Sequence, residues 1–122
     1  MKKYDYIILG SGPVAMHLLA KLERTTNEVL VVEKSLWGGT CPNTGCQPKI
    51  FMEGTVRPNS YYLAGKGIKE AAKIDWPTLV ARKKKIWAAF HKNERKSMTG
   101  KHSDTIQGKG IITGPHTVKV GD

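Results

Sequence analysis

The chain has 122 residues, enough for one ordinary domain, and its 39% hydrophobic and 25% charged residues are typical of a globular protein. No stretch approaches the roughly 20 apolar residues of a membrane span, and the apolar run at residues 7–9 is too short for a secretory signal. The net charge of +10 admits an anionic partner such as nucleic acid, a membrane surface or a phosphate-bearing cofactor. We therefore expect a cytoplasmic protein.

The first part of the chain has the pattern of a strand–helix–strand unit. The apolar run at 4–9, which ends at Gly10, predicts a buried strand. Apolar residues at helical spacing predict a helix over 13–24, and a second apolar run at 29–32, closed by Glu33, predicts another buried strand. Such a βαβ unit has parallel strands and a right-handed crossover.

A glycine-rich turn joins the first predicted strand to the helix. The stretch from Gly10 to Ala15, GSGPVA, fits the pattern G-x-G-x-x-G/A, and Glu33 follows eighteen residues later at the end of the next strand. Gly12 lets the backbone approach a pyrophosphate, whose charge the helix N-terminus favours. Glu33 can accept hydrogen bonds from a ribose diol and would repel a 2′-phosphate. The turn therefore predicts a site for FAD or NAD rather than NADP.

Both cysteines of the chain, Cys41 and Cys46, lie in a stretch rich in Gly and Pro that predicts irregular structure over 38–50. A close cysteine pair in a reducing compartment is more often catalytic or metal-binding than a structural disulfide. The two could form a disulfide only with a distorted backbone, and such a strained ring is easily reduced. No histidine has the spacing of a zinc ligand to the pair, so we predict no metal site. Two inert thiols remain an alternative.

The rest of the chain is predicted from its turn residues and caps. Pro58, Asn59 and Ser60 predict a break in the segment 51–65. Asp75 is the predicted N-cap of a helix from 76 to about 95, and 96–103 is predicted as a polar loop. Residues 107–120 are expected to form two short strands with a turn at 114–116. The tryptophans and the pair Tyr61–Tyr62 are assigned to packing.

Residues 38–49, GGTCPNTGCQPK, resemble the redox-active motif of the flavoprotein disulfide reductases, the pyridine nucleotide-disulfide oxidoreductases of the glutathione reductase, dihydrolipoamide dehydrogenase and mercuric reductase type. The resemblance extends to Ile74-Asp75-Trp76, which opens a basic helix, and to residues 106–110 before the predicted hairpin. It implies an α/β fold, a partial Rossmann-like FAD-binding domain in which a βαβ unit is followed by inserted helices and a C-terminal β-hairpin.

The resemblance also implies a role for each motif residue. Cys46 would be the charge-transfer thiol against the flavin, Cys41 the thiol that attacks a substrate disulfide, and Lys49 the lysine near flavin N5. The residues implied to bind FAD are Gly10, Ser11, Gly12, Pro13, Val14, Glu33, Lys34, Gly39, Thr40, Lys49, Lys109 and Gly110. Lys49 stands at the glutathione reductase position, whereas dihydrolipoamide dehydrogenases have their lysine at the place of Ile50. This favours a glutathione reductase-like enzyme over the dihydrolipoamide dehydrogenase and mercuric reductase types.

The resemblance covers the whole chain but corresponds only to the N-terminal part of a family member. A second dinucleotide fingerprint and the His-Pro-Glu context of the dimer-interface domain are not found. We therefore expect residues 1–122 to be the N-terminal part of a FAD-binding domain, without the NAD(P) and dimer-interface domains and inactive alone. The whole protein would be a homodimer that passes electrons between NAD(P)H and a small-molecule disulfide or dithiol.

Two readings from other classes stay open. The run Arg82-Lys83-Lys84-Lys85 beside Trp87 could follow a nucleic-acid backbone, although a solvated helix face explains it more simply, so no nucleic acid or membrane partner is predicted. A dithiol carrier without flavin would explain the cysteines but would leave Glu33 and the glycine turn unexplained.

Overall fold

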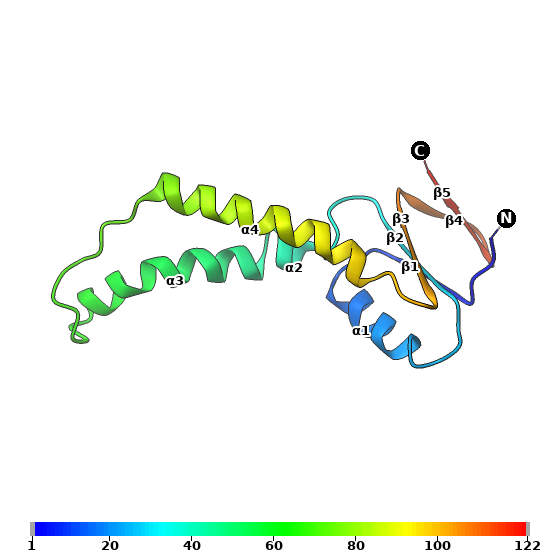
Figure 1. Ribbon diagram of the computed structural model, residues 1–122, viewed down its shortest axis with the longest axis horizontal. Coiled ribbons are helices and arrows are strands. Elements are labelled where there is room, and N and C mark those ends of the chain that lie inside the picture. The colour runs from blue at the N-terminus through cyan, green and yellow to red at the C-terminus, as the bar shows by residue number, and fades with distance from the viewer. Residues whose placement is uncertain (1, 122) are drawn as a thin grey trace.

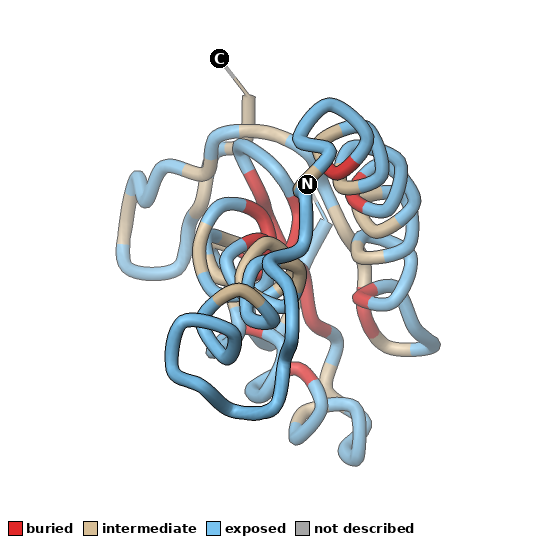
Figure 2. The backbone as a smooth tube through the Cα atoms, turned by 90° about the vertical axis from the view of Figure 1, so that its left-hand side faces the viewer, coloured by how far each residue is buried: buried red, intermediate tan, exposed pale blue. Residues whose placement is uncertain are grey.

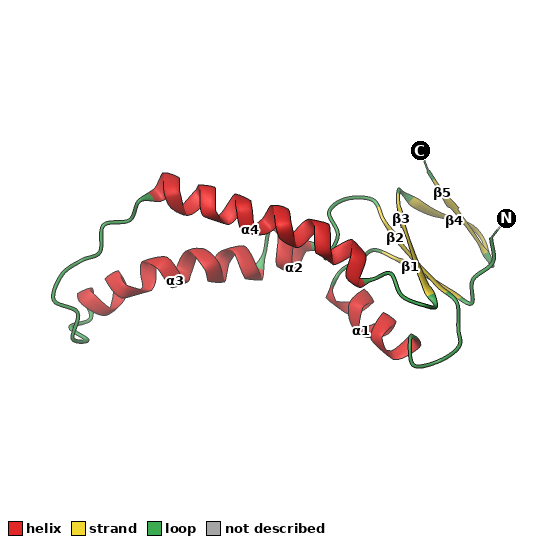
Figure 3. Ribbon diagram, viewed as in Figure 1, coloured by secondary structure: helices red, strands yellow, loops and turns green. Residues whose placement is uncertain are grey.

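The computed structural model describes residues 2–121, in which an α/β body carries two long helices that project to one side (Figure 1). Figure 3 colours helices and strands differently and shows the strands gathered at one end of the molecule. The mixed α/β fold, with a parallel sheet and a hairpin, confirms the predicted fold class. In chain order the elements are β1 Tyr6–Leu9, α1 Pro13–Leu22, β2 Val29–Glu33, α2 Thr40–Asn43, α3 Cys46–Leu63, α4 Trp76–Ser97, β3 Ser103–Gln107, β4 Gly110–Gly114 and β5 Thr117–Val120.

The core lies around the central strand of a three-stranded parallel sheet with the order β1-β2-β3. Every residue of β2 is buried, as expected for a strand with a neighbour on both sides. Leu19 of α1, Trp37 and Met98 pack with the valines of β2 to form the main apolar cluster. Figure 2 shows this concentration of buried residues in the body, while the long helices are mostly exposed.

The two outer strands differ from the sequence-based expectation. The prediction that 4–9 is a buried strand is wrong in its extent and burial, because β1 begins at Tyr6 and lies at the sheet edge. Tyr6 is 47% exposed and Leu9 is 43% exposed. The strand β3 was missed because its sequence, SDTIQ, holds a single strongly apolar residue. It pairs with β2 from Ser103 to Gln107, so the sheet has three parallel strands rather than two.

The stretch predicted as irregular over 38–50 instead contains the short helix α2 and the start of α3. The carbonyl of Thr40 accepts hydrogen bonds from the amides of both Thr44 and Gly45, which closes a single helical turn. Pro42 and Pro48 each stand third in their helix, where a backbone amide has no helical partner to lose. Prolines at these places start helices rather than prevent them.

The predicted break at 58–60 is also wrong, because α3 continues to Leu63 with Pro58 inside it. Proline in a helix interior removes one hydrogen bond and crowds the carbonyl four residues earlier, here that of Gly54.

Asn59, which was expected to favour a turn, instead fixes the segment that follows α3. Its side chain donates to the carbonyl of Ala72 at 3.0 Å and accepts from the amide of Ala72 at 2.6 Å.

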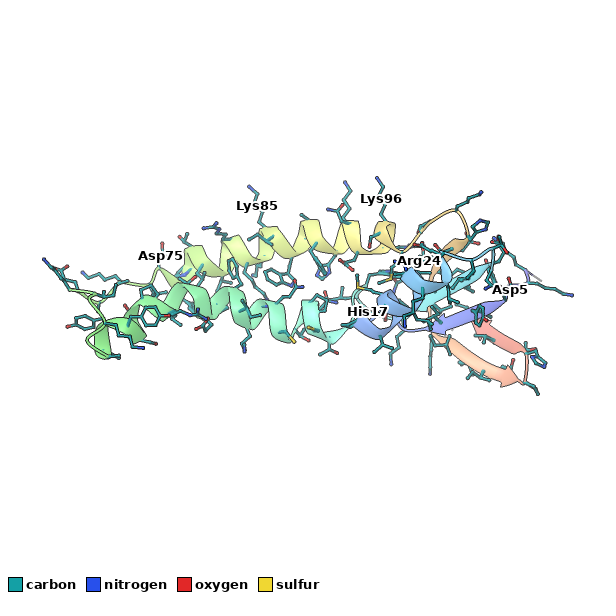
Figure 4. All side chains as sticks on the ribbon, turned by 90° about the horizontal axis from the view of Figure 1, so that it is seen from below. Asp5, His17, Arg24, Asp75, Lys85 and Lys96 are labelled. Atoms are coloured by element: carbon teal, nitrogen blue, oxygen red, sulfur yellow. The ribbon has the colours of Figure 1, made fainter. Side chains whose placement is uncertain are left out.

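The predicted helix from 76 is confirmed and runs to Ser97. Asp75 caps it by accepting hydrogen bonds from the amide of Thr78 at 3.1 Å and from its hydroxyl. Trp87 is buried in α4, as a packing role requires, whereas Trp76 is exposed. Lys85 and Lys96 point from α4 away from α3 (Figure 4).

Candidate functional site

A cavity of about 770 Å³ opens where β1 and β2 end, the edge at which ligands bind in parallel α/β sheets. The structure brings most residues of the predicted cofactor site to its walls: Gly10, Ser11, Gly12, Pro13, Glu33, Lys34, Gly39, Thr40, Lys109 and Gly110. Cys41 lines the same cavity. The remaining lining residues, Leu9, Val32, Ser35, Leu36 and Gly108, were not predicted. Leu9 and Val32 could have been included, since each stands at the end of its predicted strand.

The glycine turn is held from inside by Ser11. Gly10 has φ +100°, a conformation that favours glycine, and its amide donates to the carbonyl of Val32 at 2.8 Å. Ser11 is fully buried, and its hydroxyl donates to Oε2 of Glu33 at 2.7 Å while accepting from the amide of Gly38 at 3.0 Å. The sequence pattern treats Ser11 as a variable position, whereas the structure makes it the link between the glycine turn and the connection from β2 to α2.

Glu33 is 7% exposed, and its carboxylate accepts hydrogen bonds from the Ser11 hydroxyl, the Ser11 amide at 2.9 Å and the Ser35 amide at 2.7 Å. Burial raises the pKa of this carboxyl, but the hydrogen bonds outweigh burial and the pKa lies below its usual value. A carboxylate has about four acceptor positions, so three donors leave room for one ribose hydroxyl. Glu33 is therefore an ionised acceptor beside the cavity.

Two glycine-containing segments meet at the N-terminus of α1. A Cβ atom on Gly39 would lie 2.6 Å from the Cα of Gly12, and Gly39 has φ +74°. A Cβ on Gly12 would meet nothing within 4 Å, and Gly12 has an ordinary φ of −71°. In α1 as described, no side chain caps the N-terminus and no acidic residue lies in the first turn. This bare, open helix end fits the phosphate groups of a dinucleotide.

The segment that carries Gly39 is fastened by Asn43 of α2. The Asn43 amide group donates to the carbonyls of Trp37 at 2.8 Å and Gly39 at 2.7 Å. Because Asn43 is buried and lies two residues after Cys41, the cavity wall and the cysteine segment form one connected unit. This role of Asn43 has no sequence signal beyond its place in the cysteine motif.

The two cysteines are free thiols in this structure, and they differ in exposure. Cys41 is half-buried at the cavity wall, whereas Cys46 is exposed at the first position of α3 and does not line the cavity. A hydrogen bond between the two side chains raises the pKa of the Cys41 thiol, and burial acts in the same direction. The thiols are therefore close enough to interact, although they belong to different helices.

Three predicted site residues lie away from the cavity walls. Val14 is 82% exposed in the first turn of α1, and Lys49 is exposed on α3, one turn after Cys46. The site roles of Val14, Cys46 and Lys49 remain predictions.

The alternative reading of the basic run on α4 as a nucleic-acid surface required Trp87 to be accessible to bases. Trp87 is 9% exposed, and Lys83 lies over its ring at 5.7 Å, so its ring is not available for stacking.

Within residues 2–121, no group of three or more His, Cys, Asp or Glu side chains is arranged to hold a metal ion. Over the same residues, no helix combines the length and apolar character that crossing a membrane requires.

Comparison with known proteins decides the family. A family model described as pyridine nucleotide-disulphide oxidoreductase matches residues 4–122. The chain belongs to this family. Its members are flavoprotein oxidoreductases that also use pyridine nucleotides, which agrees with the motif resemblance.

Individual relatives are similar over nearly all of the chain. A dihydrolipoyl dehydrogenase of Mycoplasma genitalium is 27% identical over 98% of the chain and 27% of its own length. Dihydrolipoyl dehydrogenase 2, chloroplastic, of Arabidopsis thaliana is 30% identical over 98% of the chain and 22% of its own length. A soluble pyridine nucleotide transhydrogenase of Mycobacterium bovis is 28% identical over all of the chain and 27% of its own length. The chain thus spans about a quarter of these relatives.

The solved structures support the fold. The Cu(II) complex of the HOCl-induced flavoprotein disulfide reductase RclA from Escherichia coli aligns over 100% of the chain and 25% of its own, with a TM-score of 0.77 and 22% identity. At this identity the likeness bears on the fold alone. It places the βαβ unit, the long helices and the hairpin in the arrangement of a flavoprotein disulfide reductase.

Proposed function

We propose that the chain provides an FAD site and a dithiol–disulfide couple, Cys41 and Cys46, that exchanges an electron pair with a small-molecule disulfide or dithiol. The observation that carries the proposal is the position of Cys41 on the wall of the cavity that the glycine turn and Glu33 also line. A nucleotide site and a redox thiol on one cavity are what electron transfer between a flavin and a disulfide requires.

The residues of the cavity suit an anionic dinucleotide. The N-terminus of α1 and the side chains of Lys34 and Lys109 supply positive charge for the pyrophosphate, and Glu33 supplies an acceptor for the ribose. Gly12 leaves open space where the phosphates would approach the backbone. When bound, FAD would carry the electron pair between a nicotinamide and the cysteine pair.

The cysteine pair performs thiol–disulfide exchange in two steps. In one direction a cysteine thiolate attacks a sulfur of the substrate disulfide, forms a mixed disulfide and releases one substrate thiolate. The second cysteine then attacks the mixed disulfide, which closes the Cys41–Cys46 bond and releases the second thiolate. The substrate gains the electron pair that the cysteines lose. The family resemblance implies that Cys41 attacks the substrate and Cys46 faces the flavin, whereas in this structure it is Cys41 that lines the cavity and Cys46 that is exposed.

We further propose a glutathione reductase-like reaction, in which NAD(P)H is the electron source and a disulfide is reduced. The support is the place of Lys49, three residues after Cys46. The relatives described above carry the names dihydrolipoyl dehydrogenase and transhydrogenase, so a dihydrolipoamide substrate is the competing outcome. Mixing the reduced chain with glutathione disulfide or with lipoamide and measuring the rate of Cys41–Cys46 oxidation compares the two.

The test of the cofactor site is an FAD titration of the chain, followed by flavin fluorescence. Gly12→Ala should weaken binding at least tenfold, because the new methyl group occupies the space reserved for the phosphates. It should leave thermal unfolding unchanged, since its Cβ meets nothing within 4 Å.

The matched control is Gly54→Ala, which also adds a methyl group in open space but lies on α3, away from the cavity. It should bind FAD like the original chain. Equal FAD affinity for both variants would overturn the assignment of the glycine turn as the phosphate site.

A further inference from the structure

Trp87 touches both of the helices that carry the cysteines, although it lies forty-one residues after Cys46 in the sequence. Its indole Nε1–H donates to the carbonyl of Pro42 in α2 at 2.6 Å. Its ring also meets that of Phe51 in α3 edge-on, with centroids 5.7 Å apart and an interplanar angle of 71°. Trp87 is buried, so both contacts are shielded from water.

The hydrogen bond to Pro42 acts next to Cys41. Pro42 directly follows Cys41 in a helix of a single turn, where the last carbonyls have no partner inside the helix. The Trp87 indole provides that partner for Pro42 and attaches α2 to α4. Asn43 already ties α2 to the loop before it, and the Trp87–Pro42 bond adds an attachment to α4 directly beside Cys41.

The contact with Phe51 acts on the other cysteine. Phe51 stands five residues after Cys46 on the same continuous helix, so fixing the Phe51 ring also fixes the start of α3. Between the two helices, Gly45 lies against the Cys41 backbone, since a Cβ on Gly45 would be 3.3 Å from the Cys41 Cα. The turn brings the helices together, and Trp87 contacts both of them.

We propose that Trp87 is a positioning residue that sets the reduction potential of the Cys41–Cys46 pair, an inference that rests on the proposed redox function of these cysteines. The equilibrium between dithiol and disulfide depends on how often the two sulfurs come within bonding distance, that is, on the effective concentration of one thiol at the other. By holding α2 and α3 together, Trp87 raises this concentration and favours the disulfide.

The experiment equilibrates the chain with mixtures of glutathione and glutathione disulfide. One dithiol and one glutathione disulfide give one Cys41–Cys46 disulfide and two glutathione molecules, so the fraction oxidised yields an equilibrium constant. The free thiols are trapped with an alkylating reagent at each ratio and counted by mass spectrometry. Far-UV circular dichroism checks that each variant is folded.

Trp87→Phe should lower this equilibrium constant several-fold, up to the roughly tenfold limit that the net free energy of one buried hydrogen bond sets. A tenfold change corresponds to a potential about 30 mV more oxidising. The matched control, Trp76→Phe, changes an exposed tryptophan on the same helix and should stay within twofold of the original chain. Met98→Ala, which weakens the apolar core around β2, should lower thermal stability without moving the equilibrium constant.

Phe51→Leu provides a second, independent variant, because it removes the ring contact and leaves the Trp87–Pro42 bond in place. It should shift the constant in the same direction by about two- to threefold, and it decides the matter if Trp87→Phe does not fold. If the equilibrium constants of Trp87→Phe and Phe51→Leu equal that of Trp76→Phe, the positioning role of Trp87 is overturned, but the proposed redox function is not. Failure of the original chain to form an intramolecular disulfide at any ratio would overturn the proposed redox function as well.

Discussion

The α/β body and the helical arm, residues 46–97, are built under different constraints. The arm holds twelve of the twenty Lys and Arg residues but only four of the ten Asp and Glu residues, a net +8 out of the total +10. In the body, by contrast, the cavity is bordered by a wholly buried strand and by two loops that the Ser11 hydrogen bonds join. The contrast teaches that residue identity is narrowly fixed around the cavity and loosely fixed along the arm.

Two glycines with left-handed backbones provide the sharpest test of this contrast. Gly39 in the body and Gly65 in the arm have φ +74° and +64°, but only Gly39 would place a Cβ against another backbone, at 2.6 Å. Gly39→Ala should lower the free energy of unfolding by about 3 kcal/mol or more. Gly65→Ala should cost about 1 kcal/mol, the backbone strain alone. Chemical denaturation measures both, and equal losses would contradict the contrast.

Two glutamates extend the comparison to charged groups. Glu33→Gln should lower the free energy of unfolding by about 2 kcal/mol at pH 7, because an amide cannot accept all three hydrogen bonds that the buried carboxylate receives. In the arm, the half-buried Glu53 pairs with Arg57 at 2.6 Å across a solvent-accessible helix face, and Glu53→Gln should change stability by less than about 1 kcal/mol.

The effect at Glu33 should depend on pH with a definite sign. Its pKa in the folded protein lies below the usual 4.5, so its ionised form stabilises the fold above that value. This contribution is lost as the pH falls through the lowered pKa. The free energies of unfolding of the original chain and of Glu33→Gln, measured by denaturation, should therefore converge at acid pH. A difference in free energy that persists there would show that the substitution destabilises the protein through altered packing rather than through the lost charge.

The proline inside α3 tests the arm in the opposite direction. Pro58→Ala restores a backbone donor opposite the carbonyl of Gly54 and relieves the crowding of the proline ring. It should raise the free energy of unfolding by about 1 kcal/mol, a smaller change than at either body position. A destabilised variant would show that the proline shapes the arm rather than merely being tolerated in it.

The cysteines lie where the body meets the arm, and there the expected effect is on reactivity. Cys46→Ala removes the hydrogen bond that raises the pKa of Cys41. The Cys41 thiolate should then be more populated at neutral pH, and its alkylation by iodoacetamide should become a few times faster than in the original chain. The rate measured against pH reports this shift, and an unchanged profile would mean that Cys46 does not control the Cys41 proton.

The sequence was informative where a motif fixes the backbone. The pattern from Gly10 to Ala15 and the distance to Glu33 predicted the turn, the helix and the glutamate that together line the cavity. Such predictions succeed because each residue of the motif meets a local requirement, as the left-handed φ of Gly10 illustrates.

The sequence was less informative where contacts between residues far apart in the chain determine the local structure. Pro58 predicted a break, yet α3 is held by packing against α4, including the contact between Phe51 and Trp87. The polar strand β3 carries little apolar signal and forms because β2 offers it a free edge. The internal bonds of Ser11 could not be predicted either, since its partners lie far along the chain.

The Ser11 hydroxyl has a consequence for recognition. One oxygen atom bonds at once to the side chain that ends β2 and to the backbone of the loop before α2, so two walls of the cavity, the glycine turn and the β2–α2 connection, are joined at a single atom. The conformational entropy of these walls is lost during folding rather than when a ligand arrives. The cavity is therefore preorganised, and a molecule that matches its shape binds to it as to a rigid template.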